Sequence, residues 1–224
     1  MNTRIKYKPQ SLNEFVFPTE TVRTDIMQYV NGACIEPLIL HGTFGSGKTL
    51  LSELIPKAID GENVQVTNIR AETLNNSAET RKALRRDVIF DSLFSTNDQQ
   101  RNYTIVQELN NEVKACNAVR QCMDELLGRE QFIFTTNKLH NIDPGIRSRC
   151  REVELVTAPP DRFLARAKQI LAAEGTYVPE DKLLSALELL YANENDNRAY
   201  YRALDTMIYK NRHSTPPRPM LRIV

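Results

Sequence analysis

The sequence lacks a marked charge excess, a long apolar run and a paired-cysteine motif. Lys and Arg number 29 against 28 Asp and Glu, so the net charge of +1 neither requires nor excludes a polyanionic partner. The four cysteines show no C-x-x-C spacing and the three histidines lie far apart, which argues against zinc. No run is long and apolar enough to span a bilayer, and the polar start has no signal-peptide core. We expect a cytoplasmic protein without a membrane partner.

Residues 42–49 carry the most informative motif, because they fit the phosphate-binding pattern G-x-x-x-x-G-K-[ST]. An apolar run at 37–40 predicts a buried strand before the motif, and apolar periodicity from Leu50 predicts a helix after it. In such a P-loop, backbone N–H groups and the helix N-terminus surround the phosphates, Lys48 reaches the β- and γ-oxygens, and Thr49 ligates Mg²⁺. We therefore predict an ATP–Mg²⁺ site with these nucleotide-binding residues: Gly42, Thr43, Phe44, Gly45, Ser46, Gly47, Lys48, Thr49 and Leu50.

The 224 residues suffice for a large domain with a small one beside it. Strand-like and helix-like segments alternate up to residue 157, which predicts an α/β fold with a parallel sheet covered on both faces. The expected strands lie at 37–40, 64–69, 103–106, 132–136 and 153–156, and helices at 77–86, 112–127 and 144–149. Pro159-Pro160 marks a boundary, after which the segments 161–174, 179–191 and 196–212 are helical. We expect a nucleotide-binding domain over 1–157, a small all-helical lid over 158–212, and an extended or disordered tail over 213–224.

Further motifs, in this order along the chain, carry a resemblance to a known family. The opening Lys6-Tyr7-Lys8-Pro9 looks like K-Y-R-P, and residues 115–124 (ACNAVRQCMD) are similar to A-Q-N-A-L-R-R-x-M-E. Ser148-Arg149-Cys150 reproduces an S-R-C box. Together with the P-loop, these motifs resemble the AAA+ ATPases, and among them the small ATPase subunits of DNA sliding-clamp loaders of the bacteriophage and replication factor C type, over most of residues 4–205.

The resemblance implies a role for each matched residue. Tyr7 and Pro9 would border the adenine pocket. Asn137, at the end of the strand at 132–136, occupies the sensor 1 position and would orient the attacking water or touch the γ-phosphate. Arg149 would be an arginine finger, which stabilises transition-state charge on a neighbouring subunit's nucleotide and so requires an oligomer. Arg198 sits where the lid's sensor 2 arginine would be. For both arginines a solvated surface charge is the alternative interpretation.

The motif that holds Mg²⁺ departs from the family pattern. The family's strand ends in Asp-Glu, whereas the strand at 103–106 is followed by Gln107-Glu108. Glu108 can still polarise the lytic water, but Gln107 lacks the charge that attracts a hard dication. We therefore expect a slow ATPase or a nucleotide-dependent switch. The run at 88–91 also ends in a carboxylate, but we reject it as this motif because it lies in a helix-like stretch.

The family's small subunits carry a third, collar domain after the lid, whereas this chain stops at Val224. The resemblance implies a ring or spiral of this chain or of related AAA+ subunits, acting with DNA and a sliding clamp in replication, in host cytoplasm if the chain is phage-encoded. One alternative is a helicase loader or transposition-regulator-like ATPase that assembles on DNA. The other is a nucleotide-gated scaffold with little hydrolysis.

Basic residues at i, i+1, i+4 and i+5 of the helix at 77–86 offer two stripes of positive charge to a phosphate backbone. A solvated helix face is an equally compatible interpretation. The predicted DNA-binding residues, the last of them from the motif at 115–124, are Arg81, Lys82, Arg85, Arg86 and Arg120. Such contacts position a protein on DNA without reading its sequence.

Overall fold

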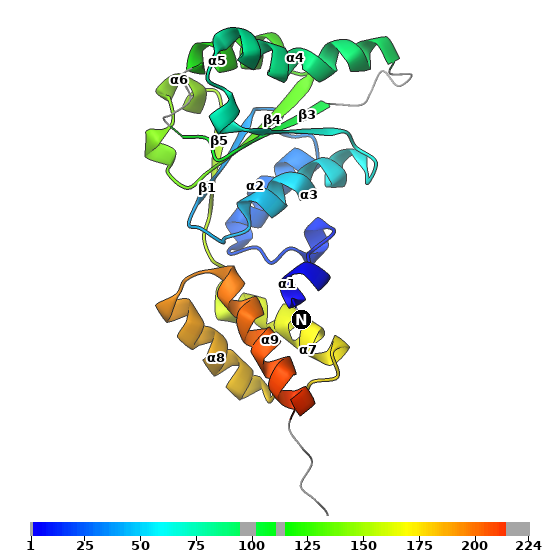
Figure 1. Ribbon diagram of the computed structural model, residues 1–224, viewed down its shortest axis with the longest axis vertical. Coiled ribbons are helices and arrows are strands. Elements are labelled where there is room, and N and C mark those ends of the chain that lie inside the picture. The colour runs from blue at the N-terminus through cyan, green and yellow to red at the C-terminus, as the bar shows by residue number, and fades with distance from the viewer. Residues whose placement is uncertain (1, 95–101, 111–114, 214–224) are drawn as a thin grey trace, which may run out of the picture. The chain divides into compact units, whose positions relative to one another are not determined.

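The structure is a computed structural model, and it describes residues 2–94, 102–110 and 115–213, without the side chains of 86–94. Figure 1 shows the elements that carry most of these residues. In chain order they are α1 (Thr3–Lys6), η1 (Leu12–Glu14), α2 (Glu20–Val30), β1 (Leu38–Gly42), α3 (Lys48–Asp60), β2 (Val66–Arg70), η2 (Ala71–Thr73), α4 (Ser77–Phe94), β3 (Asn102–Gln107), α5 (Cys116–Glu125), β4 (Glu130–Thr136), η3 (Leu139–Asn141), α6 (Pro144–Arg147), β5 (Arg151–Leu155), α7 (Pro160–Ala173), α8 (Glu180–Asn193) and α9 (Asn197–His213). Of the described helices, none has the length and apolar character needed to cross a membrane.

The described strands form a five-stranded, all-parallel sheet in the order β2-β3-β4-β1-β5. The predicted α/β fold with a parallel sheet is thereby confirmed. β1 lies between β4 and β5, with Leu40 in register with Thr135 on one side and Val153 on the other. Because all the strands run the same way, the loops that follow them emerge at one edge of the sheet.

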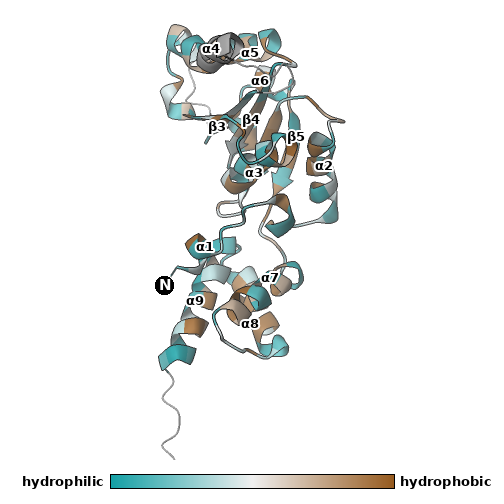
Figure 2. Cartoon of the chain, turned by 90° about the vertical axis from the view of Figure 1, so that its right-hand side faces the viewer, coloured by the Kyte–Doolittle hydropathy of each residue, from teal (hydrophilic) through white to brown (hydrophobic). Residues whose placement is uncertain are grey.

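The sheet is covered on both faces, since successive side chains of a strand point to opposite sides. Leu38 and Leu40 pack in one core cluster with residues of α2 and α3, while Ile39 packs in a second with residues of α4, α5 and α6. Figure 2 shows the apolar strands between these helices. This burial on both faces explains why the central strands β1 and β4 contain continuous apolar runs, Leu38-Ile39-Leu40 and Phe132-Ile133-Phe134.

Two segments test the assignment of elements from sequence. The run at 88–91 lies within α4 and not in a strand, in agreement with its rejection as the Mg²⁺-holding motif. Helix α2 had no counterpart among the expected elements. Its signals are a Thr19 hydroxyl that accepts the Val22 N–H at 3.2 Å and the buried Ile26 and Tyr29 on one face.

The contacts divide the described residues into two compact units, one within residues 9–158 and one formed by the residues up to Lys8 together with those from Pro159 onward. This grouping differs from the expected division at 157 in that the residues up to Lys8 group with the helical unit and not with the sheet. The Thr3 backbone N–H donates to Asp205 at 2.9 Å, and the Thr3 hydroxyl to the Tyr201 carbonyl at 3.1 Å, which fastens α1 to α9. His213, expected in the tail, is the last residue of α9, and the remaining tail at 214–224 lies outside the described residues.

The helical unit has an aromatic core and one almost buried carboxylate. The Phe163 ring lies 4.7 Å from the ring of Tyr200, between α7 and α9. Glu174, whose side chain is 3% exposed, accepts hydrogen bonds from Lys6 at 2.7 Å, the Tyr7 hydroxyl at 2.7 Å and Arg212 at 2.6 Å. Hydrogen bonds from Lys6 and then Tyr7 hold the pKa of Glu174 below its usual value. The carboxylate therefore joins the N-terminal segment to the last helix.

Gly42, at the end of β1, has φ +129°, and a Cβ there would lie 2.0 Å from the Leu155 carbonyl oxygen of β5. We expect Gly42→Ala to lower the free energy of unfolding by more than about 2 kcal/mol, because strain and backbone overlap add. Gly61→Ala is the matched control, since its φ is +91° but nothing lies within 4 Å of the added Cβ. Urea unfolding measures both variants, and equal losses would contradict the importance of the β1–β5 approach.

Glu174→Gln removes the charge that Lys6 and Arg212 surround. We expect a lower melting temperature at pH 7 and faster amide exchange over residues 3–7. Because the folded-state pKa of Glu174 is depressed, its stabilisation is present above the unfolded pKa and lost as pH falls through the folded pKa. The difference in melting temperature from wild type should therefore shrink towards acid pH. Glu180→Gln, at an exposed pair with Lys168, is the control, and a difference independent of pH would refute the expectation.

Candidate functional site

The glycine-rich loop at 42–49 connects the end of β1 to the start of α3, as its motif predicts. Gly42, Gly45 and Gly47 have φ values of +129°, +72° and +98°, a left-handed path that other residues rarely adopt. Gly47 caps α3, and a Cβ there would lie 3.0 Å from the Phe15 ring. The first-turn N–H groups of a helix have no partner within the helix, so this loop can present donors and a positive dipole end to an anion.

The Lys48 side chain turns back over this loop. Its ammonium donates to the carbonyl oxygens of Gly42, at 3.1 Å, and Thr43, and lies 3.3 Å from the Ser46 hydroxyl. Lys48 is 8% exposed, whereas Thr49 and Phe44 are exposed. A phosphate oxygen entering the loop would therefore compete with the carbonyl oxygens of Gly42 and Thr43 for the Lys48 ammonium.

At the end of β3 lie Gln107 and Glu108, where the family's Mg²⁺-holding motif has Asp-Glu. The Gln107 amide donates to the Asn68 side-chain oxygen of β2 at 3.3 Å, so two neutral side chains meet where the family pattern has a carboxylate. Glu108, exposed, follows the strand with φ +57°, and its backbone N–H donates to the Thr135 hydroxyl at 3.2 Å. The backbone therefore changes direction at Glu108.

The end of β4 lies between these residues and the glycine-rich loop. Thr135 is in register with Leu40 of β1, and Thr136 with His41, the residue just before Gly42. Asn137 follows directly, half-buried. Burial lowers the pKa of His41, so a neutral imidazole stands beside the loop at neutral pH. The structure thus brings Lys48, Glu108 and Asn137 to the same edge of the sheet.

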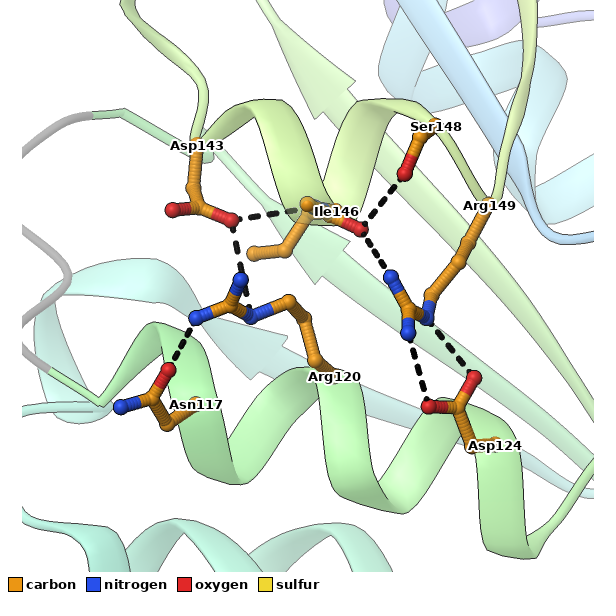
Figure 3. Close-up of polar contacts among 8 residues, drawn as sticks. Asn117, Arg120, Asp124, Asp143, Ile146, Ser148 and Arg149 are labelled. Atoms are coloured by element: carbon orange, nitrogen blue, oxygen red, sulfur yellow. Dashed lines mark hydrogen bonds and ion pairs between the residues drawn. The ribbon is translucent and has the colours of Figure 1, made fainter.

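Arg149 follows α6 and pairs with α5 (Figure 3). Its Nε and Nη2 donate to the two carboxylate oxygens of Asp124 at 2.7 and 3.0 Å, and its Nη1 to the Gly145 carbonyl at 2.8 Å. These bonds use three of the five guanidinium N–H donors. The hydrogen bonds from Arg149 hold the pKa of Asp124 below its usual value, so the pair stays charged. Asp124 was not among the site residues predicted from sequence.

Arg120 lies beside this pair on the same face of α5 (Figure 3). It contacts the Asn117 side chain and lies 3.7 Å from Asp143, whose carboxylate accepts the Ile146 N–H at 3.1 Å and so caps α6. A Cβ on Gly145 would lie 2.3 Å from the Arg120 guanidinium, which therefore packs closely over α6. The predicted DNA-binding residue Arg120 thus joins α5 to α6.

The predicted basic stripes on α4 are also engaged by α5. Arg81 donates to the Gln121 amide oxygen at 2.5 Å, and Arg85 pairs with Glu125. Lys82 is exposed, and the side chain of Arg86 lies outside the described residues. Arg81 and Arg85 are therefore cross-links between two helices, whatever else they contact.

A pocket of about 260 Å³ lies next to Arg149, lined by Glu36, Pro37, Met123, Asp124, Leu127, Ser148, Arg149 and Cys150. Burial raises the pKa of the Cys150 thiol to about 12, so this sulfur is protonated at neutral pH and is not a nucleophile. The pocket's charged groups are those of the Arg149–Asp124 pair and Glu36.

The remaining candidate residues are divided between the two units. Pro9 begins the unit that contains the sheet and is buried. Tyr7 belongs to the helical unit, where its hydroxyl is bound by Glu174. Arg198 lies exposed in the first turn of α9, and its backbone N–H donates to the Asp196 carboxylate at 2.7 Å. The roles of Tyr7, Pro9 and Arg198 remain predictions.

Comparison with known proteins agrees with this architecture. The RuvB protein of Thermotoga maritima, in a variant form, matches with a TM-score of 0.67 at 14% identity, over 88% of this chain and 64% of that structure. A second RuvB variant matches with a TM-score of 0.66. At this identity the likeness shows the fold alone.

Sequence comparison identifies relatives over most of the chain. Replication factor C small subunit 2 of Pyrobaculum arsenaticum is 26% identical over 203 residues, which are 89% of this chain and 61% of the relative. Replication factor C subunit 3 of Blastobotrys adeninivorans is 27% identical over 187 residues, 82% of this chain and 54% of the relative. The chain thus spans less than two thirds of the length of these relatives.

The family model for the "ATPase family associated with various cellular activities (AAA)" matches residues 38–158, from the start of β1 past the end of β5. That span includes the glycine-rich loop, Glu108, Asn137 and Arg149. The chain therefore belongs to the AAA ATPase family, and over most of its length it is homologous to the small subunits of replication factor C.

Proposed function

We propose that this chain binds and hydrolyses ATP and works as an oligomeric, DNA-associated, clamp-loader-like motor or switch in DNA replication. The observation that carries the proposal is the meeting of the glycine-rich loop, Glu108 and Asn137 at one edge of the sheet, as the β1–β4 register and the Glu108–Thr135 bond require. The replication setting is supported by the homology to replication factor C subunits.

The residues of the glycine-rich loop fit the phosphates of ATP. Its positive-φ glycines and the start of α3 aim N–H groups into the loop, and the Lys48 ammonium already bonds to oxygens there. Thr49 is exposed at the first turn of α3, and its hydroxyl suits Mg²⁺, a hard cation that prefers oxygen ligands. When bound, Mg²⁺ would supply charge that stabilises the transferring phosphate.

In this proposal each remaining residue has one role. Glu108 accepts a proton from the attacking water, and Asn137 orients that water with its neutral amide. Arg149 stabilises the γ-phosphate charge of a neighbouring copy or related subunit.

Tyr7 and Pro9 border the adenine, and Arg198 acts from the lid. Lys82, exposed on α4, contacts DNA phosphates, with a sliding clamp as a further partner.

One observation favours a second candidate, a nucleotide-gated scaffold with little hydrolysis. The neutral Gln107–Asn68 pair stands where the family pattern places a carboxylate, so attraction for Mg²⁺ is weaker. In a scaffold, bound ATP would favour assembly and the Arg149 contact, and turnover would be negligible. Measured turnover, compared with that of Glu108→Gln, separates the two candidates.

The central test is ATP hydrolysis over a range of protein concentrations, with and without primer–template DNA. We expect turnover that rises cooperatively with concentration and with DNA. Arg149→Ala should lower it by about 10³-fold, because an arginine supplied in trans stabilises transition-state charge. Arg147→Ala is the matched control, since Arg147 lies two residues before Arg149 but pairs with Glu152 and is not part of the proposed site. Equal loss in both variants would contradict the role of Arg149, and nucleotide binding without turnover would favour the scaffold.

Lys48→Ala tests nucleotide binding itself, independently of turnover. We expect ATP affinity to fall below detection in equilibrium binding, because the only lysine of the loop supplies its positive charge. Lys57→Ala, on the same helix at an exposed pair with Glu62, is the control. Unchanged ATP affinity in Lys48→Ala would overturn the assignment of the loop.

Gln107→Asp restores the missing carboxylate. We expect the Mg²⁺ concentration for half-maximal turnover to fall about tenfold and turnover to rise, since a unit charge near a partly solvated cation contributes on the order of 1–4 kcal/mol. Gln107→Asn shortens the side chain without adding charge and is the control. If both variants behave alike, charge at this position does not limit the reaction.

A further inference from the structure

Glu108 has an unusual backbone conformation. Among the described residues other than glycine, it shares a positive φ with Asn195 alone, at +57° against +47°. Asn adopts this left-handed region with little penalty, whereas for Glu it is strained. A conformation of this kind persists only where neighbouring groups hold it.

Thr135 supplies two acceptors that hold Glu108. The Glu108 N–H donates to the Thr135 hydroxyl at 3.2 Å, and the next N–H, of Leu109, donates to the Thr135 carbonyl at 2.8 Å. The regular pairing of β3 with β4 ends at Val106 with Phe134, the residue just before Thr135. A side-chain oxygen therefore takes part where a strand would use its main chain alone.

Thr135 is suited to this task by burial and stiffness. It is 2% exposed in β4, in register with Leu40 of β1, so it lies between β3 and the strand that leads into the glycine-rich loop. Its β-branched side chain has few accessible rotamers, so the hydroxyl is fixed by the strand. Loss of this acceptor leaves the Glu108 N–H to find another partner, which alters the angle at which Glu108 leaves β3.

Thr136, the residue after Thr135, also accepts a backbone N–H with its hydroxyl, in the loop that follows β4. Thr136 is 3% exposed, and its hydroxyl accepts the Lys138 N–H at 3.1 Å, which closes a turn around Asn137. The two adjacent threonines thus bind the loops that carry the two polar residues proposed to handle the attacking water. Valine at either position would keep the shape and the burial, but would provide no acceptor.

We propose that Thr135 and Thr136 are positioning residues of the ATPase site, whose hydroxyls set the directions of Glu108 and Asn137. The inference rests on the proposed function, and it goes further in assigning roles to two residues that act through Glu108 and Asn137. It requires that each threonine acts through the residue it holds. Removing a hydroxyl should therefore slow hydrolysis and leave ATP affinity unchanged.

The test measures turnover, ATP affinity and melting temperature of Thr135→Val and Thr135→Ser. We expect Thr135→Val to lower kcat about tenfold or more, since small misplacements of a catalytic group have effects of this size. ATP affinity should stay within about twofold of wild type, and Thr135→Ser, which keeps the hydroxyl, should restore most of kcat. Thr136→Val and Thr136→Ser are compared in the same way.

Thr104→Val is the control for a lost buried hydroxyl. Thr104 is 2% exposed on β3, and its hydroxyl donates to Glu130, away from the loops at the sheet edge. It should lower the melting temperature but leave kcat unchanged well below that temperature. If Thr135→Val does not fold, Thr135→Ala removes the same acceptor with less volume and takes its place.

A double-mutant cycle decides whether Thr135 acts through Glu108. In the Glu108→Gln background, Thr135→Val should cause little further loss, because the group that it positions is already disabled. The corresponding cycle joins Thr136→Val to Asn137→Ala. A full loss in the Glu108→Gln background, or an unchanged kcat in Thr135→Val, overturns the inference.

The same data distinguish failure of the inference from failure of the proposed function. If Glu108→Gln abolishes turnover and Thr135→Val does not alter it, only the inference fails. If the wild type shows no turnover that depends on Glu108, the proposed hydrolysis fails and the positioning role fails with it.

Discussion

The position of β1 between β4 and β5 determines most of the candidate site. The glycine-rich loop begins where β1 ends, and Gly42 can follow its path only because it lacks the Cβ that would meet the Leu155 carbonyl of β5. On the other side, the register places Thr135 and Thr136 of β4 beside Leu40 and His41. Parallel pairing therefore brings three loops to one edge, before any side chain of the site makes a contact.

The central strands were predictable from sequence because buried parallel strands contain continuous apolar runs, as at Leu38-Ile39-Leu40 and Phe132-Ile133-Phe134. Helix α2 was missed although a Thr19 cap and its apolar spacing mark it. The grouping of residues 1–8 with the helical unit could not be predicted, since it depends on contacts such as Thr3 with Asp205, across most of the chain. Motifs identified Glu108, but not the hydroxyl that holds it.

The arginines show why residue spacing alone does not define a binding surface. The i, i+4 stripe of α4 predicts outward positive charge, yet Arg81 and Arg85 meet Gln121 and Glu125 of α5. Arg149, in turn, is bound by Asp124 of the same helix. Helix α5 therefore supplies polar partners both to the arginines of α4 and to Arg149. Any anion that binds one of these arginines must share it with its α5 partner or replace that partner.

Geometry and charge are separable at the end of β3. Glu108 keeps a constrained direction, held by Thr135, whereas its neighbour Gln107 is an uncharged amide paired with Asn68. The direction of a general base is set by backbone and hydroxyl bonds, but attraction for a dication depends on net charge nearby. A chain can therefore retain the arrangement needed for water attack while its affinity for Mg²⁺ declines. In the proposed reaction, turnover at such a site would be limited by how often the cation is bound, and any partner that supplies a carboxylate or stabilises the ATP–Mg²⁺ complex would raise the rate without moving Glu108.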